Sequence, residues 1–186
     1  LELLAERSDC TEGQLEEIED IHRNLGRIVK LNKSLLLLSR IENGQFHETK
    51  NVELNPVIKE LVENFQEIYA HKNLHVEIEE NATCTVRMNE SLANILVTNL
   101  LKNAMIHTPN EGSITIRVQS TGITFTNSTD GKALDPSRLF TRFYQADNKK
   151  SDSTGLGLAI IQSIVHLYHF HITYSFDGKH RFDLRF

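Results

Sequence analysis

Asn99-Leu100-Leu101-Lys102-Asn103-Ala104 lies late in a helix predicted from its apolar periodicity, and its two asparagines fall on one helical face. A second stretch, Thr154-Gly155-Leu156-Gly157-Leu158-Ala159-Ile160, opens another predicted helix, where free backbone N–H groups and the macrodipole attract phosphate. A carboxamide oxygen suits a hard cation such as Mg²⁺, which is often shared with nucleotide phosphates. One segment can therefore hold the metal and the other the phosphates.

The composition of the 186-residue chain excludes several classes of protein. With 39% hydrophobic residues the chain can bury a core, so wholesale disorder is not expected. A formal net charge of −5 and a pI near 6.0 argue against general nucleic-acid binding, which favours a basic face. Cys10 and Cys84 lack metal-ligand spacing and fit a reduced, cytosolic setting.

The sequence has no recognisable export signal or membrane span. Its longest aliphatic run, Leu35 to Leu38, is far shorter than the roughly 20 residues that cross a membrane. We therefore expect no direct membrane contact from this chain. Because no Met precedes Leu1, which looks like a mid-helix residue, we interpret the chain as a piece of a longer protein.

A long amphipathic helix is predicted near the start of the chain. Residues 1–7 have the pattern of a helix tail, Thr11 is a candidate N-cap, and Asn43-Gly44 is a typical helix stop. Between these signals the apolar residues form one stripe, made of Ile18, Ile21, Leu25, Ile28, Leu31, Leu35 and Leu38. The stripe either packs on the chain's own domain or belongs to a helical hairpin that dimerises into a bundle, which its length and early position favour. We expect a truncated helical segment over residues 1–46 and a second domain over residues 47–186.

The second domain alternates helices with short strands. Asn55 before Pro56 predicts one N-cap and Asn89 another, and residues 45–53 are expected to form a polar linker. The predicted helices cover about 55–71, 89–107, 136–143 and 155–170, and the predicted strands 74–78, 84–86, 113–119, 123–126, 171–176 and 180–186. Because no βαβ repetition occurs, these elements predict an α+β two-layer sandwich with a mostly antiparallel sheet.

Four motifs along the chain have the order and spacing found in one known family. They are the Asn99/Asn103 pair, Asn127 to Gly131, Leu139-Phe140-Thr141-Arg142-Phe143-Tyr144, and Gly155-Leu156-Gly157-Leu158. The series resembles the N, G1, F and G2 boxes of sensor histidine kinases of two-component systems. Upstream, Leu35-Leu36-Leu37-Leu38-Ser39-Arg40-Ile41-Glu42-Asn43-Gly44 resembles the end of that family's dimerisation helix. The resemblance covers nearly the whole chain and implies a gyrase-like ATPase sandwich that binds ATP and Mg²⁺.

The N box carries the two asparagines. Asn103 matches the family's magnesium ligand, which bridges the ion to the nucleotide phosphates. Asn99 matches the first N-box Asn, a catalytic position where related ATPases carry a Glu that activates water. Because a carboxamide cannot act as a general base, Asn99 favours transfer to an acceptor over hydrolysis. Ile106 stands where the family usually carries Lys or Arg, and His107 either flanks the nucleotide or is a surface histidine.

The G1 box departs furthest from the family pattern Asp-x-Gly-x-Gly, whose Asp accepts a hydrogen bond from the adenine amino group. Asn127 stands at the Asp position and can still present an amide oxygen to adenine. Thr129 replaces the first glycine and Gly131 matches the second. Asp130 is a competing candidate inside the loop, and a plain hairpin turn without adenine contact is the remaining alternative.

The F and G2 boxes flank a lid over the nucleotide in the family. Phe140, Phe143 and Tyr144 match the F box, as lid anchors or as plain core packing. The resemblance assigns nucleotide binding to the G2 turn, which is formed by Gly155, Leu156 and Gly157. Asp152-Ser153 stands in place of further glycines, which predicts a stiffer lid.

Three cations lie beside or within the predicted lid. We expect one or two of Arg142, Lys149 and Lys150 to reach phosphates as charge-assisted donors. The alternative is a solvated run of charges without a ligand.

The histidines near the end of the chain do not have the pattern of a metal site. His166, His169 and His171 lack a Cys or carboxylate that would complete a ligand set. The family's phosphoacceptor, in a His-Glu-x-x-Thr-Pro-like context, has no counterpart here, and His22 is a poor substitute.

The resemblance implies that the chain is the cytoplasmic catalytic portion of a sensor histidine kinase whose parent is anchored in the inner membrane. In this reading the γ-phosphate of ATP goes to a histidine outside the chain and then to the receiver domain of a response regulator. The parent would be a homodimer. The alternative is a catalytically weak signalling module that acts by dimerisation and regulator docking. A nucleotide-hydrolysing ATPase is disfavoured by Asn99.

Overall fold

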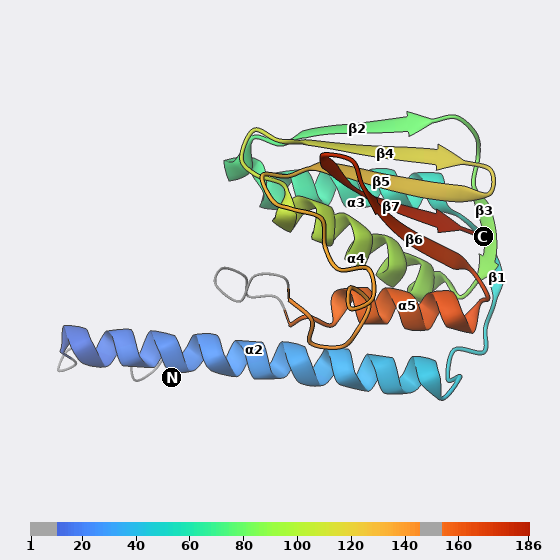
Figure 1. Cartoon of the computed structure of the whole chain (residues 1–186). Helices are drawn as coiled ribbons and strands as arrows, with labels where there is room; N and C mark the ends of the chain where they lie inside the picture. Colours follow the sequence, from blue (N-terminus) through green and yellow to red (C-terminus); the bar gives the residue numbers. More distant parts are fainter. Residues whose placement is uncertain (1–10, 146–153) are drawn as a thin grey trace.

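The main β-sheet of the computed structural model, which describes residues 11–145 and 154–186, is five-stranded (Figure 1). Its strand order is β2 (His75–Glu80), β4 (Ser113–Gln119), β5 (Gly122–Ser128), β7 (Lys179–Arg185) and β6 (His171–Phe176). Only the β2–β4 pair of this sheet is parallel, and the other neighbours are antiparallel. The predicted α+β class and the mostly antiparallel sheet are therefore confirmed.

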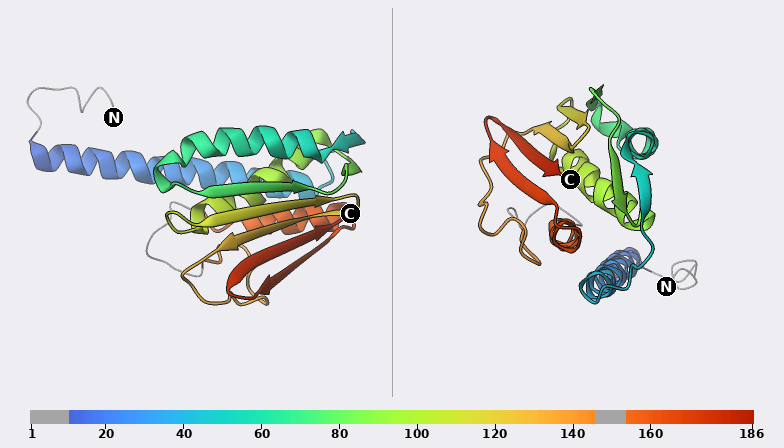
Figure 2. Two further views of the ribbon diagram at one scale, coloured as in Figure 1. Left: turned by 90° about the horizontal axis from the view of Figure 1, so that it is seen from above. Right: turned by 90° about the vertical axis from the view of Figure 1, so that its right-hand side faces the viewer.

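One face of the sheet is apolar because side chains alternate along each strand. In the β5–β7 register Phe125 lies opposite Phe182 and Ile123 opposite Leu184, and these side chains are buried. Helices α3 (Leu54–Ile68), α4 (Glu90–His107) and α5 (Gly157–Leu167) cover this face (Figure 2). Burying each such side chain stabilises the fold by about 1.5–3 kcal/mol relative to exposure.

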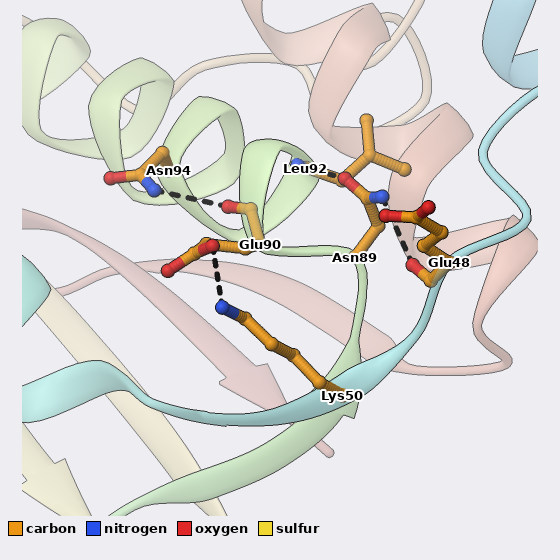
Figure 3. A network of polar contacts seen from close by, with 6 residues as sticks. All are labelled: Glu48, Lys50, Asn89, Glu90, Leu92 and Asn94. Carbon is orange, nitrogen blue, oxygen red and sulfur yellow. Dashed lines mark hydrogen bonds and ion pairs between the residues drawn. The ribbon is translucent and has the colours of Figure 1, made fainter.

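Helix α4 is the central helix of this layer, and most of its apolar residues from Leu92 to Met105 are buried. Its start is fixed by the predicted N-cap, since Asn89 Oδ1 accepts a hydrogen bond from the Leu92 N–H at 3.2 Å. The Asn89 amide also donates to the Glu48 carbonyl, and Lys50 Nζ lies 2.6 Å from Glu90 Oε2 (Figure 3). The chain that leads into the domain thus anchors the helix that carries the two key asparagines.

Two predictions around the start of the domain are wrong in detail. Part of the expected polar linker forms β1 (Lys50–Glu53), which pairs antiparallel with β3 (Thr85–Met88). Asn55 is not an N-cap, because α3 begins at Leu54. Its buried amide instead accepts from the Cys84 N–H at 2.8 Å and donates to Glu80 Oε1 at 2.7 Å. A tertiary hydrogen-bond network has overridden the local capping pattern.

The long helix is α2 (Glu12–Glu42), with the bounds that the sequence predicts. Thr11 caps it in a reciprocal capping box with Gln14. At its end Gly44 has φ +64°, and the Gln45 N–H donates to the Arg40 carbonyl, as in a Schellman motif.

The apolar stripe of α2 has two different environments. Leu38 and Ile41 are buried where the end of α2 packs beside α5. The earlier part of the helix extends beyond the sandwich (Figure 1), and Ile21, Leu25 and Ile28 are exposed there. The end of the stripe therefore packs on the chain's own domain, as in the first alternative, and the earlier part is left exposed.

Two further helix predictions need correction. Residues 136–143 form successive turns, with Leu139 N–H bonded to the Asp135 carbonyl at 3.0 Å and Thr141 N–H to the Arg138 carbonyl at 2.9 Å. Helix α5 begins at Gly157 rather than at Gly155 and ends at Leu167. The helix tail predicted over residues 1–7 and the predicted lid residues Lys149, Lys150 and Asp152-Ser153 lie outside the described residues. Among the helices in 11–145 and 154–186, none is both long and apolar enough to cross a membrane.

Candidate nucleotide-binding site

The two segments that carry most of the sequence information meet between α4 and α5. Asn99 folds its amide onto its own helix, with Nδ2 donating to the Ile95 carbonyl at 2.7 Å. The other end of the amide faces α5, because a Cβ built on Gly157 would lie 3.0 Å from Asn99 Oδ1. A glycine at the start of α5 therefore leaves room beside the carboxamide for this close approach.

Asn103 lies one turn later on the same face of α4 and is half-buried. Within the described parts of the chain its carboxamide makes no hydrogen bond. Its oxygen is thus available to an incoming cation. A hard ion such as Mg²⁺ usually keeps several water or phosphate ligands and needs few from the protein, so one amide oxygen beside a phosphate-binding turn fits it.

The F and G2 boxes are joined by their backbones. The Phe143 N–H donates to the Gly155 carbonyl at 2.9 Å, and both residues have positive φ, +63° and +66°. A Cβ on Gly155 would lie 2.8 Å from the Phe143 carbonyl carbon, so this close approach requires glycine. Phe140 and Tyr144 pack against the core, whereas Phe143 is 58% exposed. Two of the three predicted F-box aromatics therefore anchor the segment.

Asn127 occupies the last part of β5 and is buried, with only 2% of its surface exposed. It lies directly opposite His180 in the β5–β7 register, so both side chains project from the helix-covered face. Its Nδ2 donates to the Ser128 carbonyl at 3.2 Å, which leaves the amide oxygen as an acceptor. Asp130 and Gly131 are exposed in the following loop, where the Gly131 N–H donates to Thr129 Oγ1.

Sequence reasoning missed a polar network beside Asn127. The Tyr174 hydroxyl accepts from the Leu134 N–H at 2.9 Å and lies 2.8 Å from His180 Nδ1. Burial lowers the pKa of His180, so the imidazole is neutral near pH 7. The alternation His180, Phe182, Leu184 was the available signal, because it places a histidine on an otherwise apolar face.

The end of α4 carries a cation that the sequence analysis also missed. Lys72 Nζ donates to the carbonyl oxygens of Met105, Ile106 and Thr108 at 2.8, 2.9 and 2.6 Å. A positive charge there complements the negative end of the helix dipole. Desolvation, followed by the charges of His180 and Lys72, lowers the pKa of His107, although part of that residue is exposed. His107 is therefore neutral near pH 7 and does not replace the cation missing at residue 106.

Of the three cations that were expected to reach phosphates, the structure describes one. The Arg142 guanidinium pairs with the Glu42 carboxylate at the end of α2, so a carboxylate already engages its charge. Lys149 and Lys150 lie outside the described residues. Leu156, between the two G2 glycines, is buried in the core. Over residues 11–145 and 154–186, no three His, Cys, Asp or Glu side chains cluster in a way that could hold a metal.

Comparison with known proteins places this geometry in a family. Residues 88–186, more than half of the chain, match the family described as histidine kinase-, DNA gyrase B- and HSP90-like ATPase. The heme sensor protein HssS of Staphylococcus epidermidis is 36% identical over 191 residues, which cover 98% of this chain and 42% of that protein. HssS of Staphylococcus aureus is 34% identical over 187 residues, or 96% of this chain and 40% of that protein. The chain thus spans less than half the length of these relatives.

Solved structures of histidine kinases share the fold. The histidine kinase AdeS of Acinetobacter baumannii superposes with a TM-score of 0.67 at 20% identity, over 98% of this chain and 88% of that chain. Full-length ShkA, in a complex with AMPPNP, superposes with a TM-score of 0.70 at 17% identity, over 97% of this chain and 40% of that chain. The chain therefore belongs to the histidine kinase-, DNA gyrase B- and HSP90-like ATPase family, as the ATPase-domain portion of a sensor histidine kinase.

Proposed function

We propose that this chain binds ATP with Mg²⁺ between α4 and α5 and directs the γ-phosphate to a histidine outside the 186 residues. The main observation behind this proposal is that Asn99 Oδ1 lies close to Gly157, since a Cβ built on that glycine would be 3.0 Å from it. It supports a single site in which the carboxamides of α4 and the N-terminus of α5 face the same ligand.

Three parts of this site have separate roles in nucleotide binding. Asn103 offers its free carboxamide oxygen to Mg²⁺, which would supply positive charge to neighbouring phosphates. The N–H groups that open α5, from Gly155 to Gly157, donate to phosphate oxygens. Asn127 accepts from the adenine amino group at the far end of the sheet.

The reaction class follows from Asn99. A carboxamide has no basic site that could take a proton from water, so hydrolysis lacks its base. Catalysis then rests on positioning and electrostatic stabilisation, which suit transfer to a well-placed acceptor. We infer a phosphohistidine first and a response regulator receiver domain as the next acceptor.

The parent protein is proposed to be a homodimer. Ile21, Leu25 and Ile28 on α2 are about half exposed, and a helical stripe of this kind is stabilised by packing on a second helix pair. We place the chain on the cytoplasmic side of a parent that is anchored in the inner membrane. This placement rests on the kinase assignment and on the similarity to HssS.

Calorimetry with a non-hydrolysable ATP analogue, with and without Mg²⁺, tests the proposal. We expect saturable binding that tightens when Mg²⁺ is present. A companion assay measures phosphate release from ATP, which should stay at background. Absence of binding up to millimolar analogue, or steady turnover well above background, contradicts the proposal.

A second function is favoured by two observations. Arg142 is engaged by Glu42, and the G1 loop lacks one of the family's glycines, so the phosphate and base contacts are both reduced. The chain would then be a catalytically weak signalling module that acts by dimerisation and regulator docking. The same calorimetry separates the two functions, because such a module would not distinguish ATP analogue with Mg²⁺ from buffer.

A further inference from the structure

On the three central strands β4, β5 and β7, the helix-covered face of the sheet carries polar side chains at one end only. There Asn127 on β5 and His180 on β7 are paired across the ladder, and both are buried. Tyr174 on β6 is also on this face, because its register partner Phe182 is buried in the core. These three polar groups come from three different strands, so they constitute a built cluster rather than a local pattern.

The cluster holds the loop that follows β5. The Leu134 N–H donates to the Tyr174 hydroxyl at 2.9 Å, and that hydroxyl lies 2.8 Å from His180 Nδ1. Leu134 ends a stretch that begins after Ser128 and contains Gly131, the glycine that matches the G1 box. The C-terminal hairpin therefore fixes one end of this loop, and β5 fixes the other.

One hydrogen-bond direction in the cluster is fixed by its donor. A backbone N–H can only donate, so the Tyr174 oxygen accepts from Leu134 and its own proton is free to donate. His180 Nδ1 accepts that proton when the imidazole proton is on Nε2, and in the other tautomer Nδ1–H donates to the Tyr174 oxygen instead. Replacing either side chain by an apolar one removes the link and leaves a partner without its hydrogen bond.

We propose that His180 is a positioning residue for the purine base, which through Tyr174 fixes the loop after β5 and holds Asn127 in register to accept from a 6-amino group. The proposal rests on the proposed nucleotide-binding function. Asn127 touches the base, whereas His180 and Tyr174 act through the loop and the strand pair. The preferred ligand is accordingly a 6-aminopurine nucleotide.

The test compares ATP with ITP, which lacks the 6-amino group, by calorimetry on the full 186-residue chain with Mg²⁺. Tyr174→Phe and His180→Leu both break the link, and each should weaken ATP binding about fivefold, which corresponds to one neutral hydrogen bond. Both should weaken ITP binding much less, so the ATP preference falls. His180→Asn places an amide atom near the position of Nδ1 and should restore most of that preference.

Tyr168→Phe is the matched control. Its hydroxyl also accepts a backbone N–H, from Asn89 at 3.0 Å, but at the start of α4. This variant should lose the same kind of hydrogen bond without changing the ratio of ATP to ITP affinity. Exchange of the Leu134 amide proton provides a readout without nucleotide, and it should accelerate in Tyr174→Phe and not in Tyr168→Phe.

The outcomes separate this proposal from the function on which it rests. If the unsubstituted 186-residue chain binds neither ATP nor ITP, the proposed function fails and this role of His180 fails with it. If the unsubstituted chain prefers ATP and Tyr174→Phe keeps the full preference, nucleotide binding stands and the positioning role is overturned. An equal loss for ATP and ITP in every variant, with no restoration by His180→Asn, also overturns it.

Discussion

The guanidinium of Arg142 is paired with the carboxylate of Glu42, 100 residues earlier in the chain. This ion pair joins the end of α2 to the segment that carries Phe140, Phe143 and Tyr144. Both side chains are about half exposed, at 49% and 46%. Such pairs contribute little to stability, roughly 0–1 kcal/mol. The pair therefore matters more for where the Arg142 charge is directed than for the fold.

We predict that Glu42→Gln raises ATP affinity by about two- to fivefold while changing the free energy of unfolding by less than about 1 kcal/mol. The released guanidinium becomes available as a charge-assisted donor to phosphate. Calorimetry and thermal unfolding measure the two effects. Asp20→Asn, which breaks the exposed Arg23 pair on the same helix, is the control and should leave affinity unchanged. If the ATP affinity of Glu42→Gln is unchanged, Arg142 does not contact phosphate.

Asn103→Ala should abolish the Mg²⁺-dependent part of nucleotide binding and leave the helix intact, since alanine is the better helix former. Asn94→Ala on the same helix is the matched control. The Asn94 amide is exposed and donates only to the Glu90 carbonyl at 3.0 Å, as Figure 3 shows. Titrations with and without Mg²⁺ compare the two. Equal binding by both variants would remove Asn103 from the metal site.

Asn127→Asp restores the residue that the family pattern carries, and it should tighten ATP binding. A hydrogen bond to a charged partner contributes about 1.5–3 kcal/mol, against about 1 for a neutral one. Desolvation of the buried carboxylate and the nearby Asp130 oppose the gain, so we expect on the order of fivefold. The gain should appear for ATP and ADP and not for ITP. A parallel change for ATP and ITP would show that residue 127 does not contact the amino group.

Gly157→Ala should weaken nucleotide binding several-fold. The new methyl group would lie 3.0 Å from Asn99 Oδ1, and the amide cannot turn away without breaking its 2.7 Å bond to the Ile95 carbonyl. Gly26→Ala in α2 is the control, because nothing lies within 4 Å of its Cβ position. That change should stabilise the helix by roughly 0.5–1 kcal/mol without affecting binding. If Gly157→Ala binds nucleotide as tightly as the unsubstituted chain, Asn99 takes no part in nucleotide binding.

Stability should fall as the pH drops from about 7.5 to 5.5. Burial lowers the pKa values of His107 and His180 below the ordinary value of 6.5, so the unfolded chain binds more protons in this window. The groups that face them are Lys72 and Tyr174, which keep their charge states there. Denaturant unfolding at several pH values measures the slope. His180→Asn should reduce the slope, and an unchanged slope would place its origin elsewhere.

The sequence was sufficient for elements with strong local signals. Thr11 and Asn43-Gly44 bound α2 as predicted, and the strands predicted over 171–176 and 180–186 form β6 and β7. These signals depend on neighbouring residues alone, through caps and turns. The α+β class followed from the order of the elements.

Predictions failed where tertiary contacts overrode local chemistry. Asn55 had the local context of an N-cap, but its amide satisfies the buried Cys84 N–H from 29 residues away. Residues 136–143 have helical spacing but form turns, since Phe143 must adopt positive φ to meet Gly155. Strand pairing put His180 beside Asn127, and no local pattern reveals that register.

The bond from the Phe143 N–H to the Gly155 carbonyl joins the two ends of residues 144–154 at the edge of the sandwich. The entropy of closing a flexible loop grows only with the logarithm of its length, so each doubling adds about 0.6 kcal/mol. Because this bond already joins Phe143 to Gly155, we expect insertions between these two residues to cost the sheet, α4 and α5 little stability, even where the inserted stretch doubles the length of the connection.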